Sequence, residues 1–572
     1  MRPVIFLLTF TTLLIPGLIR LSSRDITSAA PSPGVTSAVE YFRTEAPVFS
    51  LHCTDLQTAI RTMDLHDAHS VASVRHKLAE CRASWKRIES FMEYFFHSSS
   101  RIYNRAPKFE AEEPGMEYQS PLGLQVIETL LYEPNTPERK RQLLEQSSAV
   151  AGSASDLLSL LYRFHAGDAQ ILESLRIELI RVITLGITGY DAPWLKTGIS
   201  ESCQSLLSIK HQLEPYHPDD TLGYYLDSAI AYCKAHDNFD TFDRLSFLKH
   251  LILPLQHQLG CFITKAQLEL NTNGILNYAA KDIFSPDALN MQTTSDSSLI
   301  AAGKKLFYDK TLSGNGQRSC ATCHNPEKKF TDGLITPIAF DGHSTLERNA
   351  PTLLYSGFQH RQFWDGRAAT LEEQVATVLQ DPKEMHTTRS DTRELAKAIA
   401  AYIRTLHPMS AVFDRYMHGG PDSLLTTRQK RGANLFMGRA QCATCHFIPL
   451  FNGLIPPDYA LTEFEVLGTT RTDRLDKPRI SKDQGRFNVY PFPFYRGAFK
   501  TPTVRNAAVT APYMHNGAFR SLDSVLEFYN RGGGQGLGLN IPSQTLSPHP
   551  LGLTPKEKKD IIQFIYTLTD AT

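Results

Sequence analysis

Two identical pentapeptides carry the clearest chemistry in this sequence. Cys320-Ala-Thr-Cys-His324 and Cys442-Ala-Thr-Cys-His446 lie 122 residues apart. Cys-x-x-Cys-His is the c-type haem attachment pattern, in which two thiols add across the porphyrin vinyl groups and the adjacent His becomes an axial ligand of the iron. Both thioethers and the imidazole must reach one macrocycle from a single turn, which this short spacing allows. The sequence therefore predicts two covalently bound haem c groups, with His324 and His446 as proximal ligands.

Two other uses of paired cysteines fit this pattern less well. A zinc ribbon needs its four ligands close together, yet a whole domain's length of chain separates the two pairs. A thioredoxin-like redox pair would need a surrounding βαβ pattern, which neither motif has. Haem attachment uses four of the nine cysteines, namely Cys320, Cys323, Cys442 and Cys445. Because five remain, at least one thiol is free or engaged in another way.

Each motif must be positioned by helices, and the flanking sequences repeat. Gly303-Lys-Lys-Leu-Phe-Tyr precedes the first motif and Gly432-Ala-Asn-Leu-Phe-Met precedes the second. Apolar residues at three- and four-residue steps predict a closing helix over 395–406 and another over 555–568. An opening helix, an attachment loop and a closing helix make one cytochrome c unit, so the repeat predicts two such units.

The chain before this repeat is poor in glycine and helical in character. Leu172, Leu175, Leu179 and Val182 recur with the periodicity of an amphipathic helix. A polar stretch over 292–298 without apolar periodicity predicts a linker. The predicted fold is mainly α: a helix bundle over 38–290, a first cytochrome c-like haem domain over 297–420, and a second over 424–572.

One segment of the predicted bundle resembles a known motif. Residues 121–128, Pro-Leu-Gly-Leu-Gln-Val-Ile-Glu, are similar to the Gly-x-His-x-x-Glu motif of imelysin-like periplasmic proteins. Gln125 stands where that motif has His, so a metal role is not carried over. The alternative is an ordinary packed helix with a buried polar pair, Gln125 and Glu128.

The N-terminus has the layout of a secretory signal. An apolar stretch over 3–19 follows Met-Arg, and Arg20 leads into a segment rich in Ser, Thr, Ala and Pro. We expect residues 1–30 to direct export. The alternative is an uncleaved N-terminal membrane tether, because the 17 apolar residues are at the lower limit for spanning a bilayer.

Composition excludes one class of partner and permits a large folded structure. The chain has 572 residues, 42% of them hydrophobic, which is enough for three or more domains with buried cores. Lys plus Arg number 59 and Asp plus Glu number 59, so the formal net charge is zero. Without a long run of like charge, nucleic acid is not an expected partner.

Beyond the haem motifs, residues from about 297 to 572 resemble the bacterial di-haem cytochrome c peroxidase family, which includes MauG. The resemblance is carried by the order and spacing of four segments: Phe363-Trp-Asp-Gly-Arg-Ala, Asp381-Pro-Lys-Glu-Met, Lys500-Thr-Pro-Thr-Val-Arg-Asn506 and Thr510-Ala-Pro-Tyr-Met-His515. It implies a periplasmic, MauG-like peroxidase that reduces hydrogen peroxide at the first haem. Electrons would reach the second haem from a small donor protein, a cytochrome c or cupredoxin, or from an oxidisable protein substrate.

The resemblance also implies roles for three residues near the first haem. Glu384 and Gln374 lie twenty and ten residues after Trp364, where the family has its peroxidatic pocket. A carboxylate whose pKa is raised by burial can take the first proton of peroxide and deliver it to the departing oxygen. Trp364 would relay electrons between the haems. Taken alone, Glu384 would be a solvated loop carboxylate and Trp364 a core residue.

The sixth ligand of each haem decides the subclass. Fourteen residues after His515, where the family carries the ligand of the second haem, the chain has Tyr529, as MauG-type enzymes do. Carrier-dependent peroxidases have Met there, and Met514 and Met437 are the rival ligands. From the residues alone, Tyr529 would be a core residue near a helix end. For the first haem we expect no distal protein ligand, with His343 a solvated loop residue.

The resemblance alone implies a calcium ion between the haem domains. Its ligands would be the side chain of Asn349 and the carbonyl groups of Thr510 and Pro512, and oxygen donors suit this hard cation. The alternative from a different functional class is a di-haem electron-transfer or binding protein without peroxidase turnover.

Overall fold

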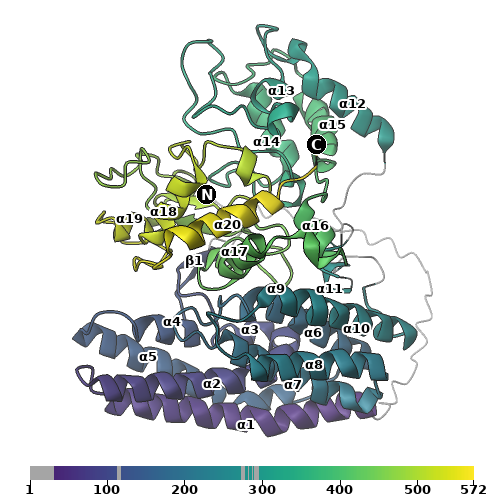
Figure 1. Cartoon of the computed structure of the whole chain (residues 1–572), viewed down its shortest axis with the longest axis vertical. Coiled ribbons are helices and arrows are strands. Elements are labelled where there is room, and N and C mark those ends of the chain that lie inside the picture. The colour runs from purple at the N-terminus through teal and green to yellow at the C-terminus, as the bar shows by residue number, and fades with distance from the viewer. Residues whose placement is uncertain are drawn as a thin grey trace, which may run out of the picture.

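The computed structural model describes residues 31–112, 117–271, 277–280, 282–285, 288 and 296–571. Figure 1 shows a layer of long helices from the N-terminal half and, stacked on it, a part richer in loops that contains the two attachment motifs. The predicted signal and residues 292–295 of the predicted linker lie outside the described residues. Within the described part of the chain, every helix is too short or too polar to cross a membrane.

The N-terminal layer is a helix bundle. Its long helices are α1 (Pro33–Thr62), α2 (Ala68–Phe95), α5 (Pro137–Ala154), α6 (Asp168–Arg181), α7 (Gly198–Leu213), α8 (Asp220–Ala235) and α10 (Leu253–Lys265). Its shorter elements are α3 (His97–Ser100), α4 (Leu124–Leu130), α9 (Arg244–Phe247), α11 (Asn277–Ala280) and the antiparallel strands β1 (Glu110–Glu112) and β2 (Glu117–Gln119).

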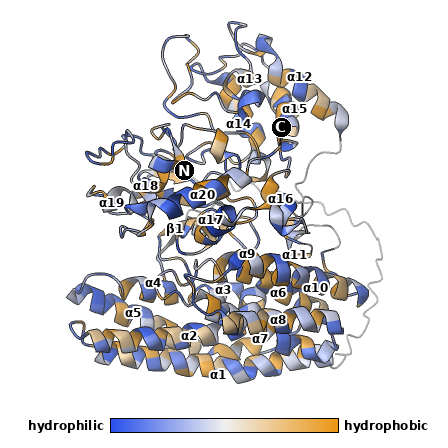
Figure 2. Cartoon of the chain, in the orientation of Figure 1, coloured by the Kyte–Doolittle hydropathy of each residue, from blue (hydrophilic) through white to orange (hydrophobic). Residues whose placement is uncertain are grey.

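Amphipathic sequence explains why these helices pack. The Ser32 and Asp67 side chains cap the first turns of α1 and α2. Hydrophobic and hydrophilic residues alternate along each helix of the layer (Figure 2), and Leu172, Leu175 and Leu179 of α6 are all fully buried. The predicted helical periodicity in this half of the chain is confirmed.

Short helices and long loops form the rest of the molecule. The first haem unit contains α12 (Ser297–Tyr308), α13 (Cys320–Cys323), α14 (Leu371–Gln380) and α15 (Thr392–Arg404). The second unit contains α17 (Thr427–Met437), α18 (Leu522–Asn530), α19 (Gly533–Gly536), α20 (Pro555–Thr567) and the antiparallel strands β3 (Phe464–Val466) and β4 (Ala498–Lys500). α16 (Val412–Met417) lies within the bounds predicted for the first unit, but its Phe413, Tyr416 and Met417 belong to the buried cluster of α17 and α20.

The repeated glycines mark where each opening helix crosses its closing helix. A Cβ on Gly303 of α12 would collide with the backbone of Ala398 in α15, and one on Gly432 of α17 would collide with the backbone of Asp560 in α20. Only glycine permits these close approaches. The predicted opening and closing helices are therefore confirmed, and the mainly helical fold class with them.

The bundle and the second haem unit share one hydrophobic core. Apolar residues of α6, α7 and α10 belong to the same buried cluster as residues of α17 and α20. The backbone N–H of Leu245 also donates to Asn434 Oδ1 over 2.9 Å, and Lys249 Nζ donates to Asp422 Oδ1 over 2.8 Å. The two parts are consequently fixed against each other.

Near the end of the chain, a buried carboxylate ties the two haem units together. Asp570 accepts hydrogen bonds from the Tyr355 hydroxyl at 2.8 Å, the Asn506 side-chain amide at 2.7 Å and the Ser410 backbone N–H at 3.0 Å. Substitution Asp570→Ala should lower the free energy of unfolding by about 3 kcal/mol, because it leaves buried donors unpaired. Denaturant unfolding measures this loss. The exposed Asp473→Ala is the control, and an equal loss in both variants would contradict the assignment.

Candidate functional site

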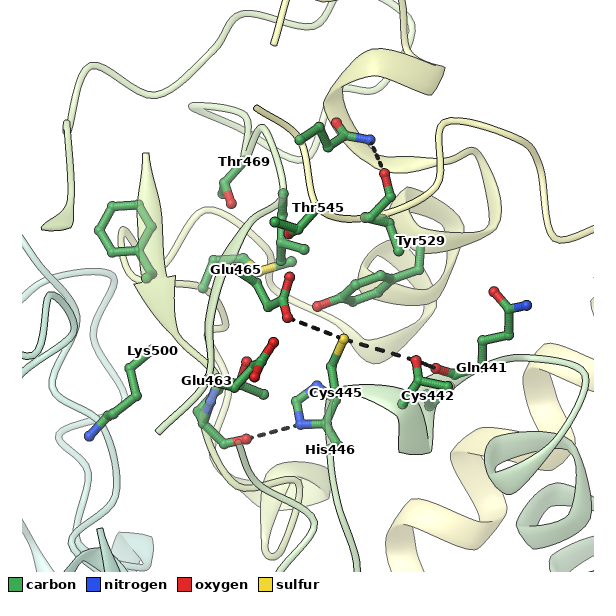
Figure 3. Close-up of a pocket in the computed structure, with 18 of the residues that line it drawn as sticks. Gln441, Cys442, Cys445, His446, Glu463, Glu465, Thr469, Lys500, Tyr529 and Thr545 are labelled. Atoms are coloured by element: carbon green, nitrogen blue, oxygen red, sulfur yellow. Dashed lines mark hydrogen bonds between the residues drawn. The ribbon is translucent and has the colours of Figure 1, made fainter. Parts of the chain in front are cut away.

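The second attachment motif faces a large cavity. Cys442, Cys445, His446 and Tyr529 all line this haem cavity, which has a volume of about 990 Å³ (Figure 3). His446 Nδ1 lies 3.0 Å from the Pro502 carbonyl oxygen. Donation of the Nδ1 proton to this carbonyl leaves the Nε2 lone pair free for a metal. Burial lowers the pKa of His446, which favours the neutral imidazole that a metal requires.

The thiols of this motif are neutral and partly exposed to the cavity. Burial raises the pKa of Cys442 to about 12 and that of Cys445 well above its usual value. Cys445 Sγ donates to Glu465 Oε1 over 3.6 Å. Two thiols and an uncommitted imidazole nitrogen, all facing one cavity, are the donor set that a covalently bound haem c needs.

The first attachment motif repeats this arrangement. Cys320 and Cys323 lie in α13, and burial raises their pKa values to about 12 and about 11. His324 Nδ1 lies 3.1 Å from the Phe330 carbonyl oxygen, and the Pro351 carbonyl also contacts the imidazole. Burial again lowers the pKa of the histidine. The residues present at this site fit a second haem c.

Trp364 lies between the segments that hold the two proximal histidines. Its indole Nε1–H donates to the Asn349 carbonyl oxygen over 2.9 Å, two residues before Pro351. The backbone carbonyl of Trp364 accepts the N–H of Lys500 over 2.8 Å. Lys500 lies two residues before Pro502. Trp364 also lines the haem cavity, and it is hydrogen-bonded to both segments.

Gln374 and Glu384 lie on either side of the end of α14. Gln374 lines the haem cavity, whereas Glu384 does not. The Glu384 carboxylate instead interacts electrostatically with Cys323 of the first motif. Burial, with a smaller contribution from Asp381, raises the pKa of Glu384 to about 7 against the opposing charges of two arginines. Glu384 is therefore a half-buried acid beside the first attachment motif and not a solvated loop carboxylate.

The hydroxyl group of Tyr529, on α18, points toward Glu465 and Cys445 (Figure 3). Burial raises the pKa of this phenol, so its anion needs a positive charge nearby. Of the rival ligands, Met514 lines the haem cavity, whereas Met437 is fully buried in the hydrophobic core. His343 is exposed on a loop.

The predicted calcium ligands all line the same cavity. Asn349, Thr510 and Pro512 contribute to its wall. The Asn349 side-chain amide donates to the Leu334 and Ile335 carbonyls, which leaves its Oδ1 as an acceptor. This is the oxygen that a cation would use.

Sequence reasoning missed several residues of the cavity wall. Glu463 and Glu465 alternate along an extended segment and so face the same side, a pattern that could have been noticed. Lys108 pairs with Glu463 from the bundle, and Tyr190 and Trp194 also reach the cavity from there. No local motif marks these three, because only the packing of the bundle on the second haem unit brings them to the site.

The imelysin-like segment forms a buried polar pair. Gln125 and Glu128 both lie on α4 and are buried. Glu128 Oε1 accepts the backbone N–H groups of Trp194 and Leu195 at 2.7 and 2.8 Å. Gln125 Nε2 donates to Asp191 Oδ1 over 3.4 Å. Glu128 thus serves the internal structure of the bundle, and Gln125 also lines the haem cavity.

Comparison with known proteins defines the class. A family model described as di-haem cytochrome c peroxidase matches residues 297–394. Cytochrome-c peroxidase IdrP2 of Denitromonas iodatirespirans is 32% identical over 326 residues, which cover 49% of this chain and 84% of that protein. The chain therefore belongs to the di-haem cytochrome c peroxidase family, as the sequence predicted.

Two further relatives are named for MauG. Methylamine utilization protein MauG of Methylorubrum extorquens is 32% identical over 295 residues, which cover 47% of this chain and 77% of that protein. The crystal structure of a MauG-like protein associated with microbial copper homeostasis is 29% identical, covers 49% of this chain and 91% of that one, and has a TM-score of 0.42. The protein is a peroxidase-like oxidoreductase with haem c cofactors.

The thiol arrangement predicts that both haems remain attached after denaturation. The mature protein should exceed its polypeptide mass by two haems in denaturing mass spectrometry, because each pair of thioethers is covalent. A Cys442→Ala, Cys445→Ala double variant should retain one haem only. Recovery of the parent as a folded protein without covalent haem would contradict the assignment of both motifs.

Proposed function

We propose that this chain is an exported, periplasmic, MauG-like peroxidase that reduces hydrogen peroxide beside the first attachment motif. Its electrons come through the second haem site from a small donor protein, a cytochrome c or cupredoxin, or from a protein substrate. The observation that carries the proposal is Glu384, a half-buried acid whose pKa is raised to about 7 and which lies beside Cys323. Hydrogen peroxide needs such a group at the site where its O–O bond is broken.

When bound, each haem supplies an iron that can change its oxidation state. The protein supplies the proton handling. A Glu384 carboxylate oxygen takes a proton from the oxygen of peroxide nearest the site and returns it to the departing oxygen, which leaves as water. Gln374 lies on the wall of the haem cavity, which Glu384 does not line, and we propose that its amide hydrogen-bonds the bound peroxide.

Trp364 is proposed to pass single electrons between the two sites. An indole can be oxidised by one electron where an aliphatic side chain cannot. The indole N–H donates to the Asn349 carbonyl, and the Trp364 backbone carbonyl accepts from Lys500, so the residue is tied to the segments that carry Pro351 and Pro502. Both of these segments contact a proximal histidine.

We also propose a calcium ion at the wall formed by Asn349, Thr510 and Pro512. All three residues line the cavity that both haem units border, so an ion there would tie the units together. Export rests on the signal-like sequence of residues 1–30, and an uncleaved membrane tether is the alternative form of the same segment.

The role of Glu384 can be tested by removing its charge. Substitution Glu384→Gln should slow the reaction with peroxide by about 10²–10⁴ while haem content stays normal, because the amide cannot accept the proton. Stopped-flow absorbance after addition of peroxide measures the rate. Glu347→Gln, an exposed neighbour, is the control. Equal rates in parent and Glu384→Gln would remove Glu384 from the mechanism. Unchanged spectra in the parent itself would favour the electron-transfer protein.

The pH dependence of the same reaction gives a second prediction. The proton-accepting form of Glu384 is the carboxylate, and the pKa of this group is raised to about 7. The parent's rate should therefore fall as the pH drops below 7 and level off above it. In Glu384→Gln this rise with pH should disappear. A parent rate that is flat from pH 5 to 8 would show that another group handles the proton.

Tyr529 is proposed as a residue that would hold the iron of the second haem together with His446. Substitution Tyr529→Phe should alter the low-spin haem spectrum and shorten the lifetime of the peroxide-oxidised protein, because an anionic phenolate stabilises the higher iron oxidation states. Electron paramagnetic resonance and absorbance decay measure both, with the exposed Tyr566→Phe as control. If neither property changes, Met514 becomes the candidate and a carrier-dependent peroxidase the better assignment.

A further inference from the structure

The bundle forms part of the wall of the haem cavity. The loop between α6 and α7 brings Tyr190, Pro193 and Trp194 to this wall, and Tyr132 reaches it from just beyond the end of α4. The relatives that define the family match about half of this chain. The bundle's contribution to the cavity therefore needs an explanation of its own.

The loop with Trp194 is held against both ends of the second attachment motif. Gln441, which directly precedes Cys442, donates from Nε2 to the Pro193 carbonyl oxygen over 3.2 Å. Phe447, which directly follows His446, packs edge-on against Tyr190 with ring centroids 5.5 Å apart. Trp194 is thus connected to the Cys442 thiol through covalent bonds and the single hydrogen bond between Gln441 and Pro193.

The Trp194 ring also extends from the cavity toward the surface. Its indole stacks on Tyr132 with ring centroids 5.4 Å apart and planes at 19°. On another side it meets the exposed His549 edge-on at 5.4 Å. Trp194 itself is partly exposed. All three residues line the haem cavity, and the exposed His549 marks a side from which a reductant could approach the Trp194 ring.

Glu128 fixes the loop that carries Trp194. Its Oε1 accepts the backbone N–H groups of both Trp194 and Leu195, and the side chain is fully buried. Removing this acceptor would leave two N–H groups unpaired and free the loop to move. Glu128 is a positioning residue for the indole.

We propose that Trp194 is the group through which electrons enter the second haem site from an external one-electron donor. This inference rests on the proposed peroxidase function. Each hydrogen peroxide takes up two electrons and two protons and yields two waters. Two donor molecules supply the electrons one at a time: Trp194 gives one electron to the oxidised second haem site and regains one from the donor, and then the cycle repeats.

Two other aromatic residues of the bundle are less suited to this role. The Arg75 guanidinium lies 3.9 Å over the Tyr132 ring, and burial raises the pKa of the Tyr132 phenol. Both effects oppose oxidation, because a phenol loses a proton with its electron and a nearby positive charge holds the electron. Trp85 is 1% exposed and donates its indole N–H to Glu89. Trp85 does not line the haem cavity and so serves as an internal reference.

The first test is an oxidation footprint of the intact holoprotein. Peroxide is added without any donor, its consumption is followed, and peptides are analysed by mass spectrometry for oxygen added to tryptophan. Trp194 should be modified at least about tenfold more than Trp85, and excess ferrocyanide should suppress the modification. An unmodified Trp194 in protein that has consumed peroxide would overturn the relay and leave the peroxidase function intact. A parent that consumes no peroxide would overturn both.

The second test compares matched variants. Trp194→Phe keeps an aromatic ring in the stack but removes the readily oxidised indole. It should lengthen the lifetime of the peroxide-oxidised protein by about tenfold in the presence of ferrous mitochondrial cytochrome c, with covalent haem content unchanged. Tyr224→Phe, at an exposed residue of the bundle that does not line the cavity, should behave as the parent. Equal lifetimes in parent and Trp194→Phe, at full haem content, would place the entry of electrons elsewhere.

Discussion

The contact of each proximal imidazole with backbone carbonyl groups is the constraint on which the haem half of this protein depends. His324 lies against the carbonyls of Phe330 and Pro351, and His446 against those of Phe451 and Pro502. A carbonyl can only accept, so each Nδ1 must carry the proton and each Nε2 must offer its lone pair to iron. Because burial also keeps both rings neutral, the ligand form is established by the fold before any metal binds.

The same carbonyl-bearing segments place the indole between the sites. Pro351 follows Asn349, which accepts from the Trp364 ring, and Pro502 follows Lys500, which donates to the Trp364 backbone. The proline whose carbonyl contacts each histidine therefore lies two residues after a residue that is hydrogen-bonded to Trp364. A shift of either segment would move a carbonyl that contacts a histidine and a partner of Trp364 together.

Local chemistry was predictable from the sequence, and long-range packing was not. The two attachment motifs, their flanking helices and the glycines at the helix crossings all have short-range signals, and the structure has them where the repeat predicted. Trp364, Gln374 and Tyr529 were found through family spacing, and all three line the cavity. Glu384 lies instead beside Cys323, and its raised pKa arises from burial that no sequence pattern reports.

The residues that escaped prediction belong mainly to the bundle. Lys108, Tyr190 and Trp194 lie more than 200 residues before the second motif, and only the common core of α6, α7, α17 and α20 brings them to it. No periodicity or spacing can encode a contact that depends on how two domains dock. The imelysin-like motif did single out Glu128. Its carboxylate, however, accepts a hydrogen bond from the backbone of Trp194, 66 residues farther along the chain.

Docking of the bundle also changes what a partner can reach. Tyr190, Pro193 and Trp194 form a wall of the cavity next to the second motif, and all three are partly exposed. A donor that approaches from there meets the bundle first. If electrons enter through Trp194 as proposed, the bundle selects the reductant while the haem half carries out the reaction with peroxide. Relatives that match only about half of this chain would then take up electrons by another route.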